Sequence, residues 1–282
     1  MATRSGVLIT ADDLMRCIAG GAEVTLLDVR WQLSQPDGYA PYLHEHLPGA
    51  VYVSLEDELS DHTVAGRGRH PLPSGPAVQA AARRWGVRDD RPVVVYDDWN
   101  RAGSARAWWV LRAAGLPDIR ILDGGLSAWK AAGGALESGP VDPDPGTVTV
   151  NHDDLYAAAM PTLTAEQVNE AQLLDARAPE RFRGDFEPVD PVAGHIPGAR
   201  NLPSPSLLAD DGTFLPTADL AGLLTDRGVG DEPVGVYCGS GVTAAIVIAA
   251  LTALGRDAAL FPGSWSQWSS EPGRPVARGG PE

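Results

Sequence analysis

The amino-acid sequence predicts an α/β protein of two similar domains, each with a mainly parallel sheet flanked by helices on both faces. Short apolar runs rich in β-branched residues alternate with helix-like segments, the pattern of buried parallel strands joined by helical crossovers. The same order of landmarks occurs twice along the chain, which indicates an internal duplication. A length of 282 residues is enough for two domains with apolar cores.

Four landmarks recur in the same order in the two halves. The matched pairs are LLDVR (26–30) with LLDAR (173–177), HLPGA (46–50) with HIPGA (195–199), VVVYDD (93–98) with VGVYCG (234–239), and DGGLSAW (123–129) with PGSWSQW (262–268). Because the order is kept and only the loop lengths differ, each half is expected to fold as one unit of the same type.

The individual elements follow from the local pattern. In the first unit, LLDVR, PVVVY and IRILDG are apolar runs bounded by turn signals and predict parallel strands. The segments 104–115 and 164–172 predict helices, the second opened by Thr164 as an N-cap. The stretch that begins at 137 is rich in proline and glycine, which predicts a linker. We therefore expect domains at 8–136 and 162–278, joined by a linker at 137–161.

Charge and hydropathy exclude several classes of partner. The formal net charge is −15, and a field of that sign repels nucleic acid and anionic lipid. The N-terminal sequence MATRSGVLIT lacks the apolar core of a signal peptide. The longest apolar run, 244–254, is about half the length needed to span a bilayer. We expect a cytoplasmic protein with no nucleic-acid or membrane partner.

The chain has only two cysteines, Cys17 and Cys238, far apart in sequence. This count argues against a disulfide framework and excludes a cysteine-rich zinc site. Neither a metal nor an organic cofactor is expected. Cys17 is expected to be a packing residue.

Cys238 stands where a predicted strand ends, before a glycine-rich loop and a helix that begins near Thr243. Gly239 and Gly241 allow the loop to curl so that its amide groups point toward the sulfur. The helix N-terminus adds a partial positive charge, and both effects favour a negatively charged sulfur. Asp97 takes the place of Cys238 in the first unit, so only the second unit has the nucleophile. The alternative is that Cys238 is an inert, buried residue at a strand end.

These features together resemble the two-domain rhodanese superfamily, and most of all its 3-mercaptopyruvate and thiosulfate sulfurtransferases. The resemblance rests on the tandem units, HLPGA and HIPGA, the CGSGVT loop and PGSWSQW, and covers nearly the whole chain. It implies a non-catalytic first domain, a catalytic second domain and a site in the cleft between them. It also implies that sulfane sulfur is carried as a persulfide on Cys238.

The resemblance also bears on the substrates. Thiosulfate-preferring members typically carry an Arg-Lys pair after the cysteine, where this chain has Gly239 and Ser240. This favours 3-mercaptopyruvate as the small anionic donor, with thiosulfate:cyanide sulfur transfer as the alternative. Gly239 is expected to bind the donor together with Gly241, Val242 and Thr243. The expected acceptor is cyanide, a thiol or thioredoxin.

A serine relay is a further implication of the resemblance. Ser240 matches the loop serine, and His70 in GRGRHPLP and Asp57 in SLEDELSD are the best matches for its histidine and aspartate. A hydroxyl oriented by a histidine can polarise the donor's carbonyl or move a proton as the C–S bond breaks.

Arg181 matches an arginine that binds the donor's anionic group in this family. An arginine presents a planar fork that suits a carboxylate. A second arginine is usual about nine residues later, but Asp190 occupies that position and 184–194 holds no Arg or Lys. Arg183 or Arg101 could replace it.

Buried ion pairs are expected at the ends of two equivalent strands. Asp28 is followed two residues later by Arg30, and Asp175 likewise by Arg177. We assign these pairs a structural role.

Two other functions fit the sequence less well than sulfur transfer. A phosphatase of the Cys-x5-Arg type needs an arginine six residues after the cysteine, where this chain has Ala244. A non-enzymatic binding module would not need the Cys238 loop. Both are therefore less favoured than sulfur transfer.

Overall fold

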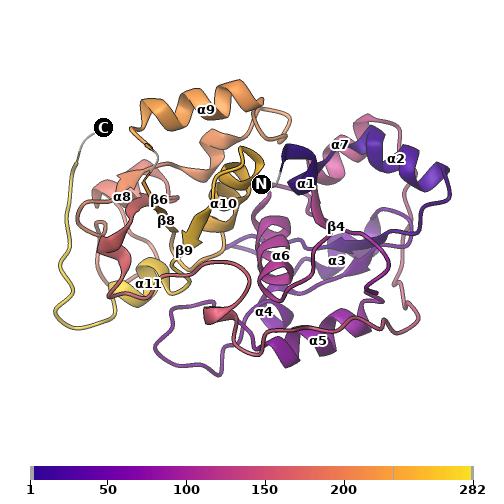
Figure 1. Cartoon of the computed structure of the whole chain (residues 1–282), viewed down its shortest axis with the longest axis horizontal. Coiled ribbons are helices and arrows are strands. Elements are labelled where there is room, and N and C mark those ends of the chain that lie inside the picture. The colour runs from indigo at the N-terminus through magenta and orange to yellow at the C-terminus, as the bar shows by residue number, and fades with distance from the viewer. Residues whose placement is uncertain (1–2, 231, 281–282) are drawn as a thin grey trace.

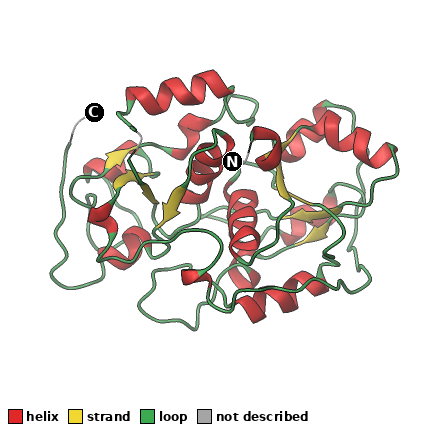
Figure 2. Cartoon of the chain, viewed as in Figure 1, coloured by secondary structure: helices red, strands yellow, loops and turns green. Residues whose placement is uncertain are grey.

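The computed structural model describes residues 3–230 and 232–280. Two α/β domains lie side by side, the N-terminal one in indigo to magenta and the C-terminal one in orange to yellow (Figure 1). In each, the strands lie among helices (Figure 2). This confirms the predicted fold class.

All strand pairs in the two sheets are parallel. The first sheet has the order β1-β5-β4-β2-β3 and the second the order β7-β6-β8-β9. The strands are β1 (Leu8–Ile9), β2 (Thr25–Asp28), β3 (Val51–Tyr52), β4 (Val93–Tyr96), β5 (Ile119–Leu122), β6 (Gln172–Asp175), β7 (Arg200–Asn201), β8 (Val234–Tyr237) and β9 (Ala258–Leu260).

Helices connect the strands and cover the sheets. In the first domain they are α1 (Arg4–Val7), α2 (Ala11–Ala19), α3 (Tyr39–His44), α4 (Leu55–Glu58), α5 (Gly75–Arg84), α6 (Ala102–Ala113) and α7 (Gly125–Ala131). In the second they are α8 (Pro179–Arg183), α9 (Thr217–Asp226), α10 (Ala244–Ala253) and α11 (Ser264–Trp268). Three 3-10 helices are η1 (Leu155–Ala157), η2 (Val168–Glu170) and η3 (Ser204–Leu207).

Alternate residues of the central strands face opposite layers, as the strand period of two requires. In β4, Val94 belongs to a core cluster with Leu14 of α2 and Trp129 of α7. Its neighbours Val93 and Val95 belong to a second cluster, on the side of α6. Both faces of the sheet are therefore buried, which explains why the strands read as continuous apolar runs.

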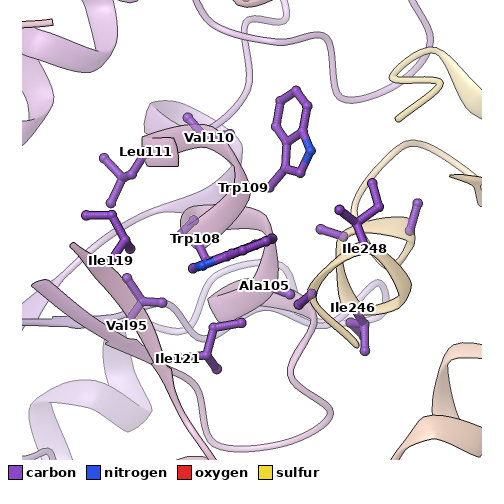
Figure 3. Packing of buried hydrophobic residues seen from close by; sticks show 14 of the residues in the cluster. Val95, Ala105, Trp108, Trp109, Val110, Leu111, Ile119, Ile121, Ile246 and Ile248 are labelled. Atoms are coloured by element: carbon purple, nitrogen blue, oxygen red, sulfur yellow. The ribbon is translucent and has the colours of Figure 1, made fainter. Parts of the chain in front are cut away.

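The two domains share this second core cluster, because α6 of the first domain packs against α10 of the second. Trp108 and Trp109 of α6 and Ile246 and Ile248 of α10 are all fully or almost fully buried. Figure 3 shows the two helices side by side with these side chains around their contact. The continuous core fixes how the loops of one domain meet those of the other.

The linker predicted at 137–161 lies against the first domain. Its Gly146 amide donates to the Arg83 carbonyl at 2.7 Å, and its Val150 amide donates to Gln79 Oε1 at 2.9 Å. Apart from the short η1, it forms no helix, as its proline and glycine content predicts.

The predicted helix at 164–172 is wrong. The segment forms a turn and the 3-10 helix η2, and the Thr164 side chain does not cap it. The preceding Leu163 amide is paired with the Leu260 carbonyl at 2.7 Å, and β6 already begins at Gln172. Too few residues remain between these fixed points for an α-helix of ordinary length, so tertiary pairing overrides local propensity.

Candidate functional site

Cys238 directly follows β8 and lies at the start of a tightly curled loop. The Gly241 amide donates to Cys238 Sγ at 3.2 Å. Gly241 has a φ of +79°, and a β-carbon there would lie 2.5 Å from the Pro262 carbonyl oxygen. Glycine is therefore required at this position to turn an amide toward the sulfur.

The rest of the loop is held by the turn that begins α11. The Cys238 and Gly239 carbonyls accept hydrogen bonds from the amides of Trp265 (3.0 Å) and Ser266 (2.9 Å). Val242 is buried. The loop ends at Thr243, which is half-buried and precedes the first residue of α10. The predicted loop residues thus form one turn between Cys238 and the N-terminus of α10, with the Gly241 amide directed at the sulfur.

The equivalent loop of the first domain shows what such a loop binds. Asp97 follows β4, and its Oδ1 accepts hydrogen bonds from the amides of Trp99 at 3.1 Å and Arg101 at 3.2 Å. Its Oδ2 accepts from the amide of Ser104 at 3.1 Å and from the Ser104 hydroxyl at 2.6 Å. Here the inward-facing amides bind the chain's own carboxylate. The matching loop after β8 directs the Gly241 amide at Cys238 Sγ, and an inward amide of this kind favours a negatively charged sulfur.

Ser240 and His70 come from different domains and are in contact. Ser240 Oγ lies 2.7 Å from His70 Nδ1, and His70 Nε2 lies 3.1 Å from Glu56 Oε1. The carboxylate only accepts, so Nε2 carries the proton and donates to it, which leaves Nδ1 to accept from the Ser240 hydroxyl. Trp31 Nε1–H also donates to Glu56 Oε1, at 2.6 Å.

Burial and hydrogen bonding determine the protonation states of Glu56 and His70 near neutral pH. The hydrogen bond from His70, assisted by Trp31, lowers the pKa of Glu56 to about 2 despite partial burial. Burial lowers the pKa of His70 below its usual 6.5, although Glu56 opposes that shift. His70 is therefore a neutral base beside an ionised carboxylate.

Asp57, the acid expected beside His70, lies elsewhere. Its amide donates to Ser54 Oγ at 3.2 Å, and the Ser54 hydroxyl donates to its carboxylate at 2.7 Å. Ser54 is the N-cap of α4, and adjacent helical residues point in directions about 100° apart. Glu56 consequently faces His70 and Asp57 does not. The Ser-x-x-Asp spacing of a helix cap was a signal for this arrangement.

Two arginines from different domains flank the loop. Nη1 of Arg181, on α8, lies 3.5 Å from the position that a β-carbon on Gly239 would occupy. Nη2 of Arg69, in the first domain, lies 3.1 Å from the same position. Arg69 was missed in the sequence, although it directly precedes the predicted His70. The predicted substitutes are held by other partners: Arg101 is paired with Asp97 of the first domain's own loop at 2.9 Å, and Arg183 with Asp185 at 2.7 Å.

Acidic side chains hold both arginines in place. Asp190 pairs with Arg69 and, at 3.1 Å, with Arg181. Glu187 pairs with Arg181 at 2.6 Å and with Arg177 at 3.3 Å. Burial raises the pKa of Asp190, and the nearby Glu187 adds to that effect. The ion pairs of Asp190 and Glu187 with Arg69 and Arg181 offset much of the positive charge beside Gly239.

Arg106 of α6 joins the two domains behind the loop. It is fully buried and donates to the carbonyls of Leu59 at 2.9 Å, His70 at 3.1 Å and Gly241 at 3.2 Å. Burial lowers its pKa to about 10. One guanidinium thus fixes the His70 backbone relative to the Cys238 loop.

The expected buried ion pairs are confirmed. Arg177 Nη2 lies 2.6 Å from Asp175 Oδ2, and Arg30 Nη2 lies 2.8 Å from Asp28 Oδ2. All four side chains are almost completely buried. Arg177 also stacks on the Trp265 ring at 4.7 Å, which connects its pair to the turn that holds the Cys238 loop.

Within residues 3–230 and 232–280, no group of three or more His, Cys, Asp and Glu side chains is arranged to hold a metal ion. In the same residues, no helix has the length and apolar character needed to cross a membrane.

Comparison with known proteins assigns the fold to a family. The family model for the rhodanese-like domain matches residues 10–132 and 161–271. The chain belongs to the rhodanese family. This confirms the resemblance read from the CGSGVT loop and the paired landmarks.

Its rhodanese relatives match over almost their full length. A putative thiosulfate sulfurtransferase of Mycobacterium tuberculosis is 66% identical over 282 residues, covering 99% of each chain. A probable 3-mercaptopyruvate sulfurtransferase of Pseudomonas aeruginosa is 44% identical over 284 residues, covering 98% of this chain and 99% of the relative. The rhodanese-fold crystal structure of SseA from Escherichia coli, described as a 3-mercaptopyruvate sulfotransferase, matches with a TM-score of 0.79 at 35% identity. That match covers 92% of this chain and 98% of SseA.

Proposed function

We propose that this rhodanese-family protein is a sulfurtransferase that moves sulfane sulfur from 3-mercaptopyruvate to a thiophilic acceptor through a persulfide on Cys238. The observation that carries the proposal is the Cys238 loop, where an inward amide contacts the sulfur and Ser240 contacts His70. The names of its relatives support the reaction class, since they are called sulfurtransferases.

In the first step, the Cys238 thiolate attacks the sulfur of 3-mercaptopyruvate. An S–S bond forms and the C–S bond breaks, with its electron pair passing to the enolate of pyruvate. The donor's thiol proton ends on the enolate carbon, so pyruvate leaves and Cys238 keeps a negatively charged persulfide. The loop amides and the N-terminus of α10 stabilise that charge.

Ser240 and His70 are placed to manage this proton. The Ser240 hydroxyl can take up the donor's thiol proton while it passes its own proton to His70 Nδ1, and the same relay then returns that proton to the enolate carbon. Glu56 then stabilises the imidazolium from the other side of the ring. In this scheme Glu56 takes the role first assigned to Asp57.

The relatives' names differ on the donor, so the choice rests on the site. Gly239 and Ser240 supply no charge, and Arg69 and Arg181 are already paired with Asp190. A monoanion with a polarisable ketone fits this site better than a dianion. Thiosulfate:cyanide sulfur transfer is the alternative.

In the second step, the acceptor attacks the outer sulfur and Cys238 leaves as the thiolate. The proposed acceptors are cyanide, a small thiol and thioredoxin. Cys17 and Cys238 are both free thiols. A reducing, cytoplasmic compartment is therefore the proposed location.

Intact-protein mass spectrometry tests the proposal. After incubation with 3-mercaptopyruvate we expect a gain of about 32 Da, one sulfur, on Cys238, removed by cyanide. Cys17→Ser should keep the adduct and Cys238→Ser should lose it. If neither 3-mercaptopyruvate nor thiosulfate produces the adduct in the wild type, the protein is a binding module and the proposal fails.

A further inference from the structure

Asp190 lies between the two arginines that border the Cys238 loop. It belongs to the segment between α8 and β7, and its side chain is only 3% exposed. One carboxylate oxygen pairs with Arg69 and the other with Arg181 Nη2 at 3.1 Å. A single carboxylate thus connects a cation of the first domain to a cation of the second.

Both arginines still have N–H groups available for a ligand. Arg69 pairs with Asp190 through Nη1, and its Nη2 lies on the Gly239 side. Arg181 bonds to its acidic partners through Nε and Nη2, and Nη1 lies on the Gly239 side. An anion above the loop can therefore bind both guanidinium groups while Asp190 remains in place.

Asp190 and Glu187 differ in their hydrogen-bond partners besides Arg181. Glu187 accepts hydrogen bonds from the Val189 and Asp190 amides as well as from Arg177 and Arg181. It shapes the backbone of its own loop. Among the described residues, the Asp190 carboxylate has hydrogen bonds only with the two arginines that flank Gly239. Its main effect is on the charge presented at the loop.

We propose that Asp190 determines the charge of the anion that the donor site accepts. Its carboxylate cancels one of the two positive charges of Arg69 and Arg181, so the site binds monoanions in preference to dianions. The choice of donor follows from this inference only if the sulfur transfer proposed above is correct. Anion binding itself does not depend on that reaction.

The physical reason is the Coulomb energy between Asp190 and the bound anion. This energy is proportional to the ligand's charge, so a dianion is repelled about twice as strongly as a monoanion at the same place. Affinity depends exponentially on energy, so the factor for a dianion is about the square of the factor for a monoanion. If removing the Asp190 charge increases the affinity for a monoanion about threefold, it increases the affinity for a dianion about tenfold.

The test measures binding by calorimetry in a Cys238→Ser background, which cannot react. Pyruvate is the monoanion and thiosulfate the dianion. Asp190→Asn should lower the Kd of pyruvate about threefold and that of thiosulfate about tenfold. Asp185→Asn removes an equal charge from the exposed part of the same loop and should leave both unchanged. Asp190→Ser repeats the test should the asparagine variant fold poorly.

Equal tightening of the two anions would overturn the proposal. Weaker binding of both anions by Asp190→Asn would also overturn it, because Asp190 would then only position the arginines. The proposal fails as well if neither anion binds to any of the variants. With Cys238 restored, Asp190→Asn should raise the ratio of kcat/KM for thiosulfate to that for 3-mercaptopyruvate. If the wild type transfers no sulfur from either donor, the proposed function fails while the calorimetric result still stands.

Discussion

Replacing Glu56 by glutamine removes the negative charge beside His70 but keeps an oxygen that can accept from His70 and from Trp31. In the wild type the charge stabilises the imidazolium that forms when His70 Nδ1 takes the proton from Ser240. A hydrogen bond to a charged group contributes about 1.5–3 kcal/mol and a neutral one about 0.5–1.5 kcal/mol. The difference, about 1–1.5 kcal/mol, corresponds to roughly a tenfold fall in kcat. The Glu56 side chain is only 28% exposed, so solvent screening weakens this interaction only a little.

The pH profile gives this prediction a second readout. Activity requires neutral His70, whose pKa lies below 6.5 because of burial, so the rate falls as the pH drops through that pKa. Glu56 has a pKa of about 2 and stays ionised over this range. Because Glu56 raises the pKa of His70, Glu56→Gln should shift the acidic limb to still lower pH.

The assay is steady-state kinetics with 3-mercaptopyruvate over a series of pH values. Asp57→Asn is the matched control, since Asp57 bonds to Ser54 and not to His70. We expect it to change kcat less than twofold. The reasoning is refuted if Asp57→Asn lowers kcat as much as Glu56→Gln, or if Glu56→Gln changes KM alone and leaves the acidic limb in place.

Two further predictions concern stability and are checked by urea unfolding. Asp175→Ala leaves Arg177 buried without its principal partner and should cost about 3–5 kcal/mol; a loss below about 1 kcal/mol would mean that Glu187 compensates it. Gly103→Ala places a β-carbon 1.8 Å from the Val29 carbonyl oxygen and should destabilise by about 1–3 kcal/mol. Gly222→Ala, on α9 with nothing within 4 Å of the new carbon, should instead stabilise by about 0.5–1 kcal/mol. Similar effects at both glycines would contradict the steric argument.

The fold and the position of the nucleophile were predictable because the signals are local and occur twice. LLDVR and LLDAR each end in a buried Asp-x-Arg pair, and the loop after the second VY strand carries the cysteine. The segment 164–172 was not predictable in this way, since its helical propensity is overridden by the pairing of Leu163 with Leu260.

The residues that surround Cys238 were harder to predict because several come from the other domain. Glu56 and Asp57 differ by one position, and only the start of α4 at Leu55 decides which acid faces His70. Arg69 is separated from Arg181 by more than a hundred residues, so nothing local indicates that both flank Gly239. Such pairings depend on how α6 packs against α10.

The loop after β4, closed around its own Asp97, makes the first domain unable to hold an exchangeable anion. That domain instead supplies His70, Glu56 and Arg69 to its partner's loop. The second domain therefore holds the reactive sulfur, and side chains of both domains surround the place where the donor binds. Substitutions of Arg69 or His70 in the first domain can alter the donor's surroundings without changing the sequence of the loop that holds Cys238. A duplicated protein of this kind can acquire new donors without rebuilding its reactive centre.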